Sequence, residues 1–410
     1  MSENREEFGL DRAAALAPAL RMMLRNPAPG IVTFRGDPAH MRLCRKENWE
    51  MAVRSGEIQG IWVPADADLE KQYAALGAAV TAYKDTYGAP PYVIAVENVG
   101  LFYAGSDKPS ADALADGVPP AGKQGRVPSA GENQAPARAR RLEGKIGVVT
   151  GGAQGFGYGL AEAMIGEGGY VVLADLNGPL AKEAADTLGK NGRALAVQTD
   201  VTDEASVIRL LRETVLAYGG LDIFVNHAGV LNAGGLEEMT KDAFEFVTRV
   251  NYTAYFTCVK YASAVMKIQH RFAPEMMMDI IQINSKSGLS GSNKNFAYAG
   301  GKFGGIGLVQ SFALELIPYN IKVNAVCPGN LLSGPLWTDP EKGLFVQYLN
   351  AGKVPGAKTV EDVRRFYESK VPMNRGCEII DVARACFYVI EQEYETGQAL
   401  PVTGGQNMLK

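Results

Sequence analysis

The chain has 410 residues, of which 47% are hydrophobic and 21% charged, and its formal net charge is −4. Such a composition is typical of a globular protein, and the length predicts two or three domains. The slight acidity argues against a dedicated nucleic-acid surface. No apolar run reaches the roughly 18–20 residues that a membrane span requires, and residues 1–7 lack the apolar core of a signal peptide. We therefore expect a cytoplasmic protein that binds neither nucleic acid nor membrane.

Metal binding is not expected from the cysteines and histidines. The chain has five cysteines, none of them in a CxxC pair, and three histidines. A zinc ribbon or a disulfide framework needs closely spaced or paired cysteines. With only three histidines, a histidine-rich metal site is not expected either.

The N-terminal residues 1–104 predict a small α/β domain to which the sequence assigns no role. The runs Ile31–Phe34, Ile58–Val63 and Tyr92–Val96 are expected strands, and Leu69–Tyr83 is an expected helix. Residues 105–141 are dominated by Ala, Gly, Pro and Ser. Such a segment buries too little apolar area to order itself, so we predict a linker, with a short helix near residues 110–116 as the alternative.

Residues 142–410 alternate between short apolar runs and helical stretches. Runs that are apolar on both faces are typical of a parallel sheet with helices on both sides. The pattern predicts a doubly wound α/β domain. The expected strands are Ile146–Val149, Tyr170–Ala174, Ala194–Val197, Ile223–Val225, Ile280–Ile283 and Lys322–Val326, and expected helices include Leu160–Gly166, Glu204–Tyr218 and Phe303–Leu316.

A glycine-rich turn follows the first of these strands. Residues 150–157 read TGGAQGFG and lead into a helix. Glycines there permit a tight turn and a close approach of the backbone to a pyrophosphate at the helix N-terminus. Asp175 ends the second strand, 20 residues after Gly155, where a carboxylate accepts hydrogen bonds from ribose hydroxyls and repels a 2′-phosphate. No Lys or Arg lies in the turn or in residues 176–178, so NAD is favoured over NADP.

Ser285, Tyr298 and Lys302 form the expected catalytic group. Tyr298 and Lys302 are four apart, so on a helix they share a face. The ammonium should lower the pKa of the phenol, which then takes a proton from an alcohol as hydride leaves the carbon. Ser285 follows a strand at the carboxyl edge, where its hydroxyl would hold the substrate oxygen. Asn251, after the stretch Phe244–Val250, would anchor a water that relays the proton.

These motifs together resemble the short-chain dehydrogenase/reductase family over about residues 142–410. The resemblance implies an NAD-dependent alcohol dehydrogenase with Tyr298 as base or acid and Lys302 on the nicotinamide ribose. It implies further cofactor contacts from the turn (Gly151, Gln154, Gly155, Phe156, Gly157), around adenine (Asp200, Val201), along the next strand end (Asn226, Ala228, Gly229) and at the carboxamide (Pro328, Gly329, Ser333). His227 departs from the family's usual second asparagine, and Gly300 and Gly301 lie between Tyr298 and Lys302.

Within the family, residues 280–406 resemble sorbitol-6-phosphate 2-dehydrogenases. This implies oxidation of sorbitol 6-phosphate to fructose 6-phosphate. Alternatives are the same chemistry on another sugar alcohol, sugar or small carbonyl compound, and a non-catalytic NAD sensor or scaffold. Residues 96–108 are similar to the end of the class II aldolase module in aldolase–dehydrogenase fusions, but the paired histidines that hold zinc there are missing, so aldolase activity is not expected.

A phosphorylated substrate needs cations near the pocket. We hypothesise that one or more of Lys286, Lys294 and Arg375 bind the phosphate, the alternative for each being solvated surface charge. Residues 330–372 are longer than a strand connection needs and predict either a lid over the substrate or a static helical pair. The family resemblance also implies a homodimer or homotetramer.

Overall fold

The computed structural model describes residues 11–25, 28, 30–117, 140–291, 293–350 and 352–408. In this part of the chain the larger sheet has seven strands in the order β11-β10-β9-β8-β5-β6-β7. Every neighbouring pair is parallel. The predicted doubly wound α/β fold is therefore confirmed. The strands are β5 (Ile146–Thr150), β6 (Tyr170–Asp175), β7 (Ala194–Gln198), β8 (Ile223–Asn226), β9 (Met278–Ile283), β10 (Ile321–Pro328) and β11 (Ala399–Val402).

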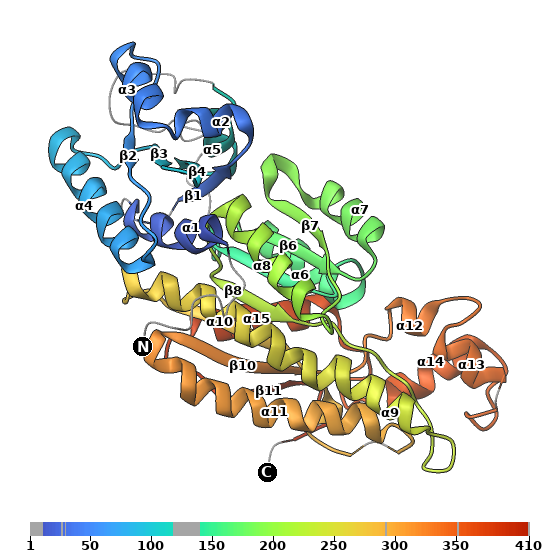
Figure 1. Cartoon of the computed structure of the whole chain (residues 1–410). Coiled ribbons are helices and arrows are strands. Elements are labelled where there is room, and N and C mark those ends of the chain that lie inside the picture. Colours follow the sequence, from blue (N-terminus) through green and yellow to red (C-terminus); the bar gives the residue numbers. More distant parts are fainter. Residues whose placement is uncertain are drawn as a thin grey trace.

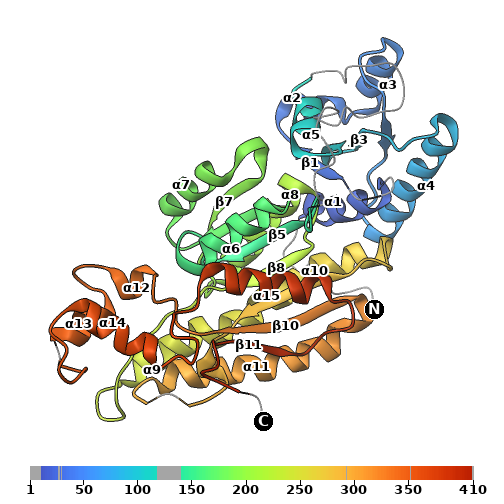
Figure 2. The ribbon, with the colours of Figure 1, turned by 180° about the vertical axis from the view of Figure 1, so that it is seen from behind.

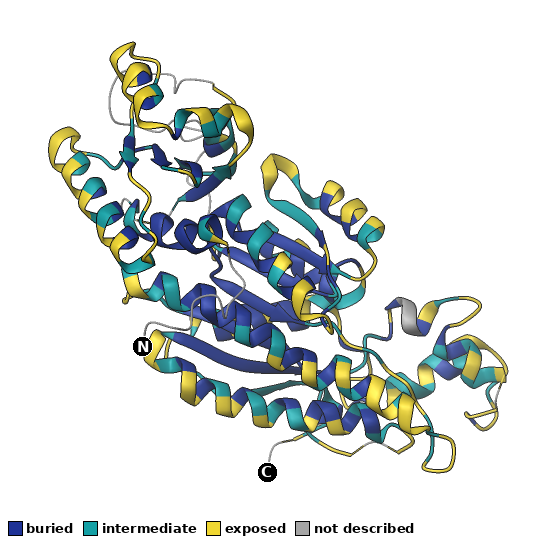
Figure 3. Ribbon diagram, viewed as in Figure 1, coloured by how far each residue is buried: buried dark blue, intermediate teal, exposed yellow. Residues whose placement is uncertain are grey.

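Helices cover both faces of this sheet (Figures 1 and 2). On one face lie α8 (Glu204–Tyr218), α10 (Ala254–Phe272) and α11 (Phe296–Leu316), and on the other α6 (Gly155–Gly166), α7 (Gly178–Leu188) and α15 (Ile379–Glu391). Each face has its own apolar core. Figure 3 shows the central strands as buried, in keeping with their apolar sequences. Shorter elements are α9 (Lys241–Thr248), a π-helical turn at Arg249–Thr253 and 3₁₀ turns at Lys190–Gly192, Lys286–Gly288 and Ile317–Tyr319.

The N-terminal part folds around a second sheet with the strand order β1-β4-β3-β2. β4 is antiparallel to both β1 and β3, and β2 is parallel to β3. The sequence anticipated three of these strands and one helix. The elements are α1 (Arg12–Met23), β1 (Ile31–Arg35), α2 (Pro38–Leu43), α3 (Lys46–Arg54), β2 (Ile61–Val63), α4 (Leu69–Tyr87), β3 (Val93–Val96), β4 (Gly100–Gly105) and α5 (Lys108–Ala115).

The start of the predicted linker is folded. α5 lies where a short helix was the alternative, and Ala111 is fully buried within the core of the larger domain. The Lys108 ammonium donates to the Thr33 hydroxyl at 3.1 Å and to Asp112 at 2.5 Å. Composition alone missed this because alanines in a short helix pack against a neighbour without large side chains. Residues 118–139, the rest of the predicted linker, lie outside the described residues.

A buried ion pair joins the N-terminal unit to the dehydrogenase-like domain. The two guanidinium nitrogens of Arg21 on α1 lie 2.9 and 2.8 Å from the carboxylate oxygens of Asp222, and the side chains are 1% and 0% exposed. Arg21 also donates to the carbonyls of Gly30 and Gly144, and Asp222 accepts from the Ile146 amide. Asp222 directly precedes β8, so this pair lies at the amino edge of the sheet.

The segment expected as a lid forms a helical projection at the end of the molecule opposite the N-terminal unit (Figures 1 and 2). It comprises α12 (Pro335–Thr338), α13 (Leu344–Asn350) and α14 (Val360–Ser369). Trp337 packs with Phe345 and Tyr367, each with a ring-centroid separation of 5.1 Å. Their shared core is separate from the two cores of the sheet. We call this segment the α12–α14 unit.

Breaking the buried pair should destabilise the whole chain. Arg21→Met leaves the Asp222 carboxylate buried without its cation, which should lower the free energy of unfolding by about 3–5 kcal/mol. The matched control is Arg25→Met, because Arg25 is a solvent-accessible partner of Glu275 and should cost less than about 1 kcal/mol. Urea unfolding measures both changes. An equal decrease in the free energy of unfolding in the two variants would contradict the structural importance of the Arg21–Asp222 ion pair.

Candidate active site

The glycine turn between β5 and α6 is compact but open at the helix N-terminus. Gly151 and Gly155 have φ values of +66° and +59°, which glycine adopts without strain. A Cβ on Gly157 would lie 2.0 Å from the Gly151 carbonyl oxygen, whereas one on Gly155 would meet nothing within 4 Å. The N–H groups of Gly151, Gly152 and Ala153 bond Ala174 and Asp175. The first N–H groups of α6 have no intrahelical acceptor, so the helix N-terminus fits an anionic group such as a dinucleotide pyrophosphate.

Thr150 ties the glycine turn to the end of β8. Its side chain is buried, and its hydroxyl oxygen accepts hydrogen bonds from the backbone N–H groups of His227 and Ala228, both at 3.0 Å. The His227 ring adds a contact of 3.1 Å between Nδ1 and the Gly151 carbonyl oxygen. The carboxyl ends of β5 and β8 are thus held together, as a cleft between neighbouring strands requires.

Burial keeps His227 neutral. It lowers the pKa of the ring to about 4, and the nearby Lys302 ammonium contributes in the same direction. A neutral ring that bonds a carbonyl through Nδ1 carries its proton there, which leaves Nε2 as an acceptor. His227 replaces the asparagine that is usual at this position. Its Nδ1–H donates a hydrogen bond to the Gly151 carbonyl of the glycine turn.

Asp175 and Asp200 both organise backbone at the ends of their strands. The Asp175 carboxylate accepts from the Ala153 amide at 3.1 Å and from the Asn177 amide at 3.0 Å. Asp200 accepts from the amide and hydroxyl of Thr202 at 2.8 and 2.7 Å. Each carboxylate oxygen has a second lone pair, so these bonds leave acceptor capacity for a ligand.

Asn251 fastens the π-helical turn to the loop after β8. Its side-chain oxygen accepts from the Val230 amide at 2.9 Å, and its nitrogen donates to the Val230 carbonyl at 2.7 Å. A Cβ on Gly229 would come within 2.9 Å of the same oxygen. The predicted water-anchoring role would fall to the second amide proton and the second lone pair of Asn251. Asn226, predicted to contact the cofactor, is the last residue of β8, and its side chain is buried.

The structure brings Ser285, Tyr298 and Lys302 together. The Ser285 side chain hydrogen-bonds the Tyr298 phenol, and its oxygen also accepts from the Ser287 amide at 3.1 Å. The Lys302 ammonium lies 5.6 Å from the centre of the Tyr298 ring and donates to the Ile283 carbonyl oxygen at 2.9 Å. A hydroxyl, a phenol and an ammonium therefore meet at the carboxyl end of β9.

The expected lowering of the Tyr298 pKa was wrong for the protein without ligands. Burial raises the pKa of the phenol, the hydrogen bond from Ser285 offsets part of this rise, and the Cys327 thiol adds to it. Burial also lowers the pKa of Lys302 to about 8. Sequence reasoning counted the attraction between ammonium and phenolate but not the cost of removing both charges from water.

Asn284 is a positioning residue that the sequence analysis did not single out. Its side-chain nitrogen donates to the Lys302 carbonyl at 2.9 Å and to Gln282, and its oxygen accepts from the Ser285 amide at 2.8 Å. It therefore links the strand end to α11 on both sides of the catalytic group. A buried polar residue at a strand end, directly before the candidate serine, was the available signal.

Comparison with known proteins agrees with this geometry. The family model for short chain dehydrogenases matches residues 145–341. Sorbitol-6-phosphate 2-dehydrogenase of Escherichia coli (strain K12) is 36% identical over 272 residues, which are 64% of this chain and 99% of that protein. The chain belongs to the short-chain dehydrogenase family. Members of this family bind NAD or NADP, and the chain is an oxidoreductase by this membership.

Other short-chain dehydrogenases show the breadth of the family. The crystal structure of sorbitol-6-phosphate 2-dehydrogenase SrlD from Erwinia amylovora is 38% identical with a TM-score of 0.58 and covers 64% of this chain and 100% of its own. A 2,5-dichloro-2,5-cyclohexadiene-1,4-diol dehydrogenase of Sphingobium indicum is 31% identical, over 65% of this chain and 98% of its own. The family and the resemblance to sorbitol-6-phosphate 2-dehydrogenases are confirmed. The family model begins at residue 145, so the N-terminal unit lies outside it, and the similarity of residues 96–108 to an aldolase stays a prediction.

Two segments meet at Pro328 and Gly329, the residues predicted to flank the nicotinamide carboxamide. Pro328 ends β10, and the amide of Gly329 bonds the Val402 carbonyl of β11 at 2.9 Å. Ser333, predicted to bond the carboxamide, is exposed and donates instead to Glu378 at 3.2 Å. This contact turns the hydroxyl toward the start of α15.

The three proposed phosphate ligands differ in their partners. Lys294 lies 3.6 Å from the carboxylate of Glu238, and both side chains are exposed. Arg375 forms a two-bond ion pair with Asp381 at 2.6 and 3.0 Å. Lys286 is half-buried and donates to the neutral Gln406 side chain at 3.3 Å. Of the three, Lys286 alone has no carboxylate partner among the residues that the structure describes.

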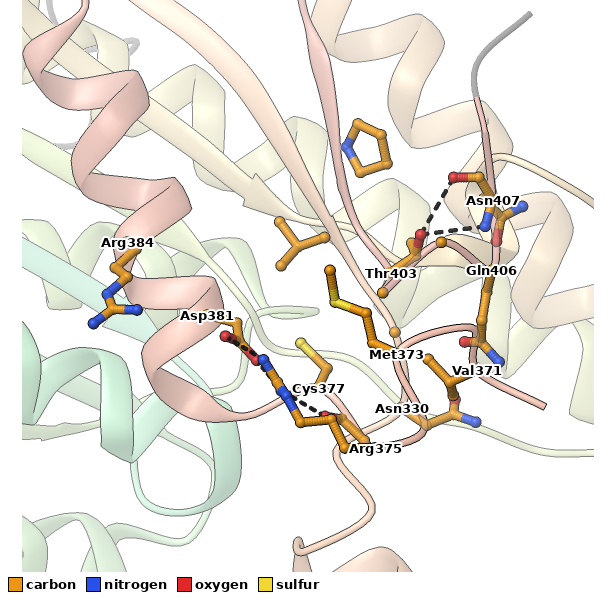
Figure 4. Close-up of a pocket in the computed structure, with 16 residues that line it drawn as sticks. Asn330, Val371, Met373, Arg375, Cys377, Asp381, Arg384, Thr403, Gln406 and Asn407 are labelled. Atoms are coloured by element: carbon orange, nitrogen blue, oxygen red, sulfur yellow. Dashed lines mark hydrogen bonds and ion pairs between the residues drawn. The ribbon is translucent and has the colours of Figure 1, made fainter. Parts of the chain in front are cut away.

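A cavity of about 450 Å³ lies beside this region (Figure 4). Its lining comes from the end of β10, the segment after α14, the start of α15 and the C-terminal residues 401–407. Cavities of about 300–1,000 Å³ hold small ligands. Arg375 and Asp381 line it as a pair, and the Gln406 side chain forms part of its wall.

The neutral His227 makes stability depend on pH. The pKa of His227 is about 4 in the folded chain and 6.5 as a free side chain, so the unfolded chain binds more protons between these values. Stability from this residue is present above pH 6.5 and is lost as pH falls toward 4, at up to about 1.4 kcal/mol per pH unit. His227→Asn should flatten the pH dependence of urea unfolding over this window. His270→Asn, on α10, is the control, and a wild-type slope in His227→Asn would refute the assignment.

Proposed function

We propose that the chain is an NAD-dependent dehydrogenase of hexitol phosphates that interconverts sorbitol 6-phosphate and fructose 6-phosphate. The observation that carries the proposal is the meeting of Ser285, Tyr298 and Lys302 at the end of β9. Its substrate class is supported by the 36% identity to the sorbitol-6-phosphate 2-dehydrogenase of Escherichia coli. The identity spans nearly the whole of that relative.

In the proposed reaction Tyr298 handles the proton and Ser285 holds the substrate oxygen. NAD, when bound, supplies the hydride acceptor for the secondary carbinol carbon. Tyr298 removes the hydroxyl proton in the oxidation and returns it in the reduction. The Ser285 oxygen accepts from the Ser287 amide, so its single proton serves as a donor. In the protein without substrate that proton bonds Tyr298, and in the proposed reaction it turns to the substrate oxygen.

Lys302 serves as the positioning cation of the site. One of its three protons is used by the Ile283 carbonyl, which leaves two for ribose hydroxyls. Its ammonium also favours the phenolate of Tyr298 electrostatically, even though burial acts against both charges. We assign the remaining cofactor contacts to the glycine turn and to the strand ends named in the sequence analysis.

We also propose NAD rather than NADP as the cofactor. The Asp175 carboxylate ends β6 directly beside the glycine turn, where it bonds the Ala153 amide. A negative charge at this position repels a 2′-phosphate and accepts from ribose hydroxyls. The NADP complex of RhlG from Pseudomonas aeruginosa, at 24% identity, shares the fold and leaves the cofactor of this chain open.

The α12–α14 unit is proposed as the substrate lid, and a homodimer or homotetramer as the assembly. The lid proposal is supported by the separate apolar core of the α12–α14 unit, which lets the unit move as one body. Limited proteolysis tests the lid proposal: equal cleavage of the α12–α14 unit with and without NAD and substrate would show that the unit is static.

The proposed assembly is supported by apolar side chains that α10 and α11 expose, among them Phe256 and Leu314.

Removing the charge at Asp175 should relax cofactor choice. Asp175→Asn keeps the acceptor for the Ala153 amide but not the negative charge. The ratio of kcat/KM for NAD to that for NADP should fall about tenfold, which is 1.4 kcal/mol of discrimination. The control is Asp186→Asn, because Asp186 is an exposed partner of Lys182 on α7. An unchanged ratio in Asp175→Asn would show that another group selects the cofactor.

Tyr298→Phe should remove turnover but keep cofactor binding. Loss of the proton acceptor should lower kcat by about 100-fold or more. Absorbance at 340 nm with NAD, sorbitol 6-phosphate and a panel of polyols measures it, and Tyr319→Phe, in the 3₁₀ turn that follows α11, is the control. NAD binding without turnover on any of these compounds would favour a sensor. Turnover of unphosphorylated polyols alone would show that the substrate is a free sugar alcohol.

A further inference from the structure

Two cations close to the candidate catalytic serine have no carboxylate partner in the part of the chain that the structure describes. Lys294 and Arg375 are paired with acids, whereas Lys286, next to Ser285, contacts the Gln406 amide oxygen at 3.3 Å. A carboxylate beside an ammonium would compete with a bound anion. Because the Lys286 ammonium has no carboxylate beside it, it is more available than Lys294 or Arg375 to bind a substrate phosphate.

Lys370 is the second of these cations, and the sequence did not single it out. It follows directly after α14, at the base of the α12–α14 unit. Its ammonium lies over the rings of Phe366 and Tyr367, 4.2 and 5.1 Å from their centres. Among the residues that the structure describes, no ion pair of Lys370 with a carboxylate is found.

The fold brings Lys370 to Lys286. Val371, next to Lys370, packs on Gly404, where an added Cβ would come within 2.7 Å of it. Met373 donates from its amide to the Gly404 carbonyl at 3.2 Å, and Gln406 lies two residues further on. The C-terminal segment 404–406 thus bridges the base of the α12–α14 unit and the catalytic loop.

The two ammonium groups repel one another. Burial lowers the pKa of Lys286, and the positive charge of Lys370 lowers it further. A doubly charged anion between them would remove this repulsion and would satisfy both ammonium groups. The adjoining cavity of about 450 Å³, lined by Val371 and Gln406, provides space for the rest of a small ligand.

We propose that Lys286 and Lys370, assisted by the side-chain amide of Gln406, bind the phosphate group of the substrate. This inference rests on the proposed function for the identity of the phosphate ester. The phosphate then connects the catalytic loop to the base of the α12–α14 unit, so a phosphorylated substrate holds the two segments together. A free hexitol lacks this link. The two lysines therefore act as specificity determinants for a phosphorylated polyol.

The first test uses inorganic phosphate as the probe and needs no turnover. Phosphate should raise the Tm of the full-length protein above that in chloride of equal ionic strength, because it binds the folded chain. Lys370→Gln and Lys286→Gln should each lose most of this rise, and Lys370→Arg should keep it. Lys353→Gln is the matched control, since Lys353 also lies over an aromatic ring of the α12–α14 unit, 4.3 Å from the centre of Tyr348.

The second test measures specificity. In Lys370→Gln, the ratio of kcat/KM for sorbitol 6-phosphate to that for sorbitol should fall by about tenfold or more, the loss of one charge-assisted hydrogen bond. Wild-type behaviour of Lys370→Gln in both tests would overturn the inference and leave the proposed function intact. A phosphate effect that depends on both lysines, without turnover of any hexitol phosphate by the wild type, would support the site and defeat the proposed function.

Discussion

The hydrogen bond from the Lys302 ammonium to the Ile283 carbonyl fixes the candidate active site. It joins α11 to the last residue of β9 at 2.9 Å. Ser285 lies two residues beyond that carbonyl, and Tyr298 lies one helical turn before Lys302. One buried bond therefore sets the distance between the serine and the tyrosine. Asn284 strengthens the same junction, because it bonds the backbone on both sides. The reacting groups are preorganised before any ligand binds.

Sequence reasoning found most of this site because its residues lie at positions that the chain marks locally. Glycines in a turn and a serine after an apolar run mark strand ends, and Tyr298 and Lys302 share a helix face by spacing. It failed where the chain carries no local mark. β4 begins and ends with glycine, and β11 has only four residues, one of them Pro401. α1 is buried nearly all round, so it has no polar face to reveal its period. The partnership of Arg21 with Asp222 joins residues 201 positions apart. Lys370 was likewise inconspicuous, since its importance arises from the segment that folds beside it.

The N-terminal unit completes the core of the larger domain. Ala14 and Ile31 are fully buried in the same apolar core as residues of α8 and α10. A Cβ on Gly219, at the end of α8, would come within 2.7 Å of Val32, so the two backbones approach closely. Because these contacts and the Arg21–Asp222 pair lie at the amino edge of the sheet, they stabilise the domain without reaching the catalytic group.

In the proposed mechanism, burial makes the candidate catalytic group depend on a bound cofactor. In the protein without ligands, burial raises the pKa of Tyr298 and lowers that of Lys302 to about 8, so both residues are displaced toward their neutral forms. Proton removal from an alcohol needs the phenolate. A positively charged nicotinamide ring is an electrostatic partner that favours phenolate without occupying the hydrogen-bonding position of the substrate. The same burial that makes the phenol a poor base in the free protein makes every nearby charge more effective. We infer that proton transfer and cofactor binding are coupled through this shared low-dielectric site.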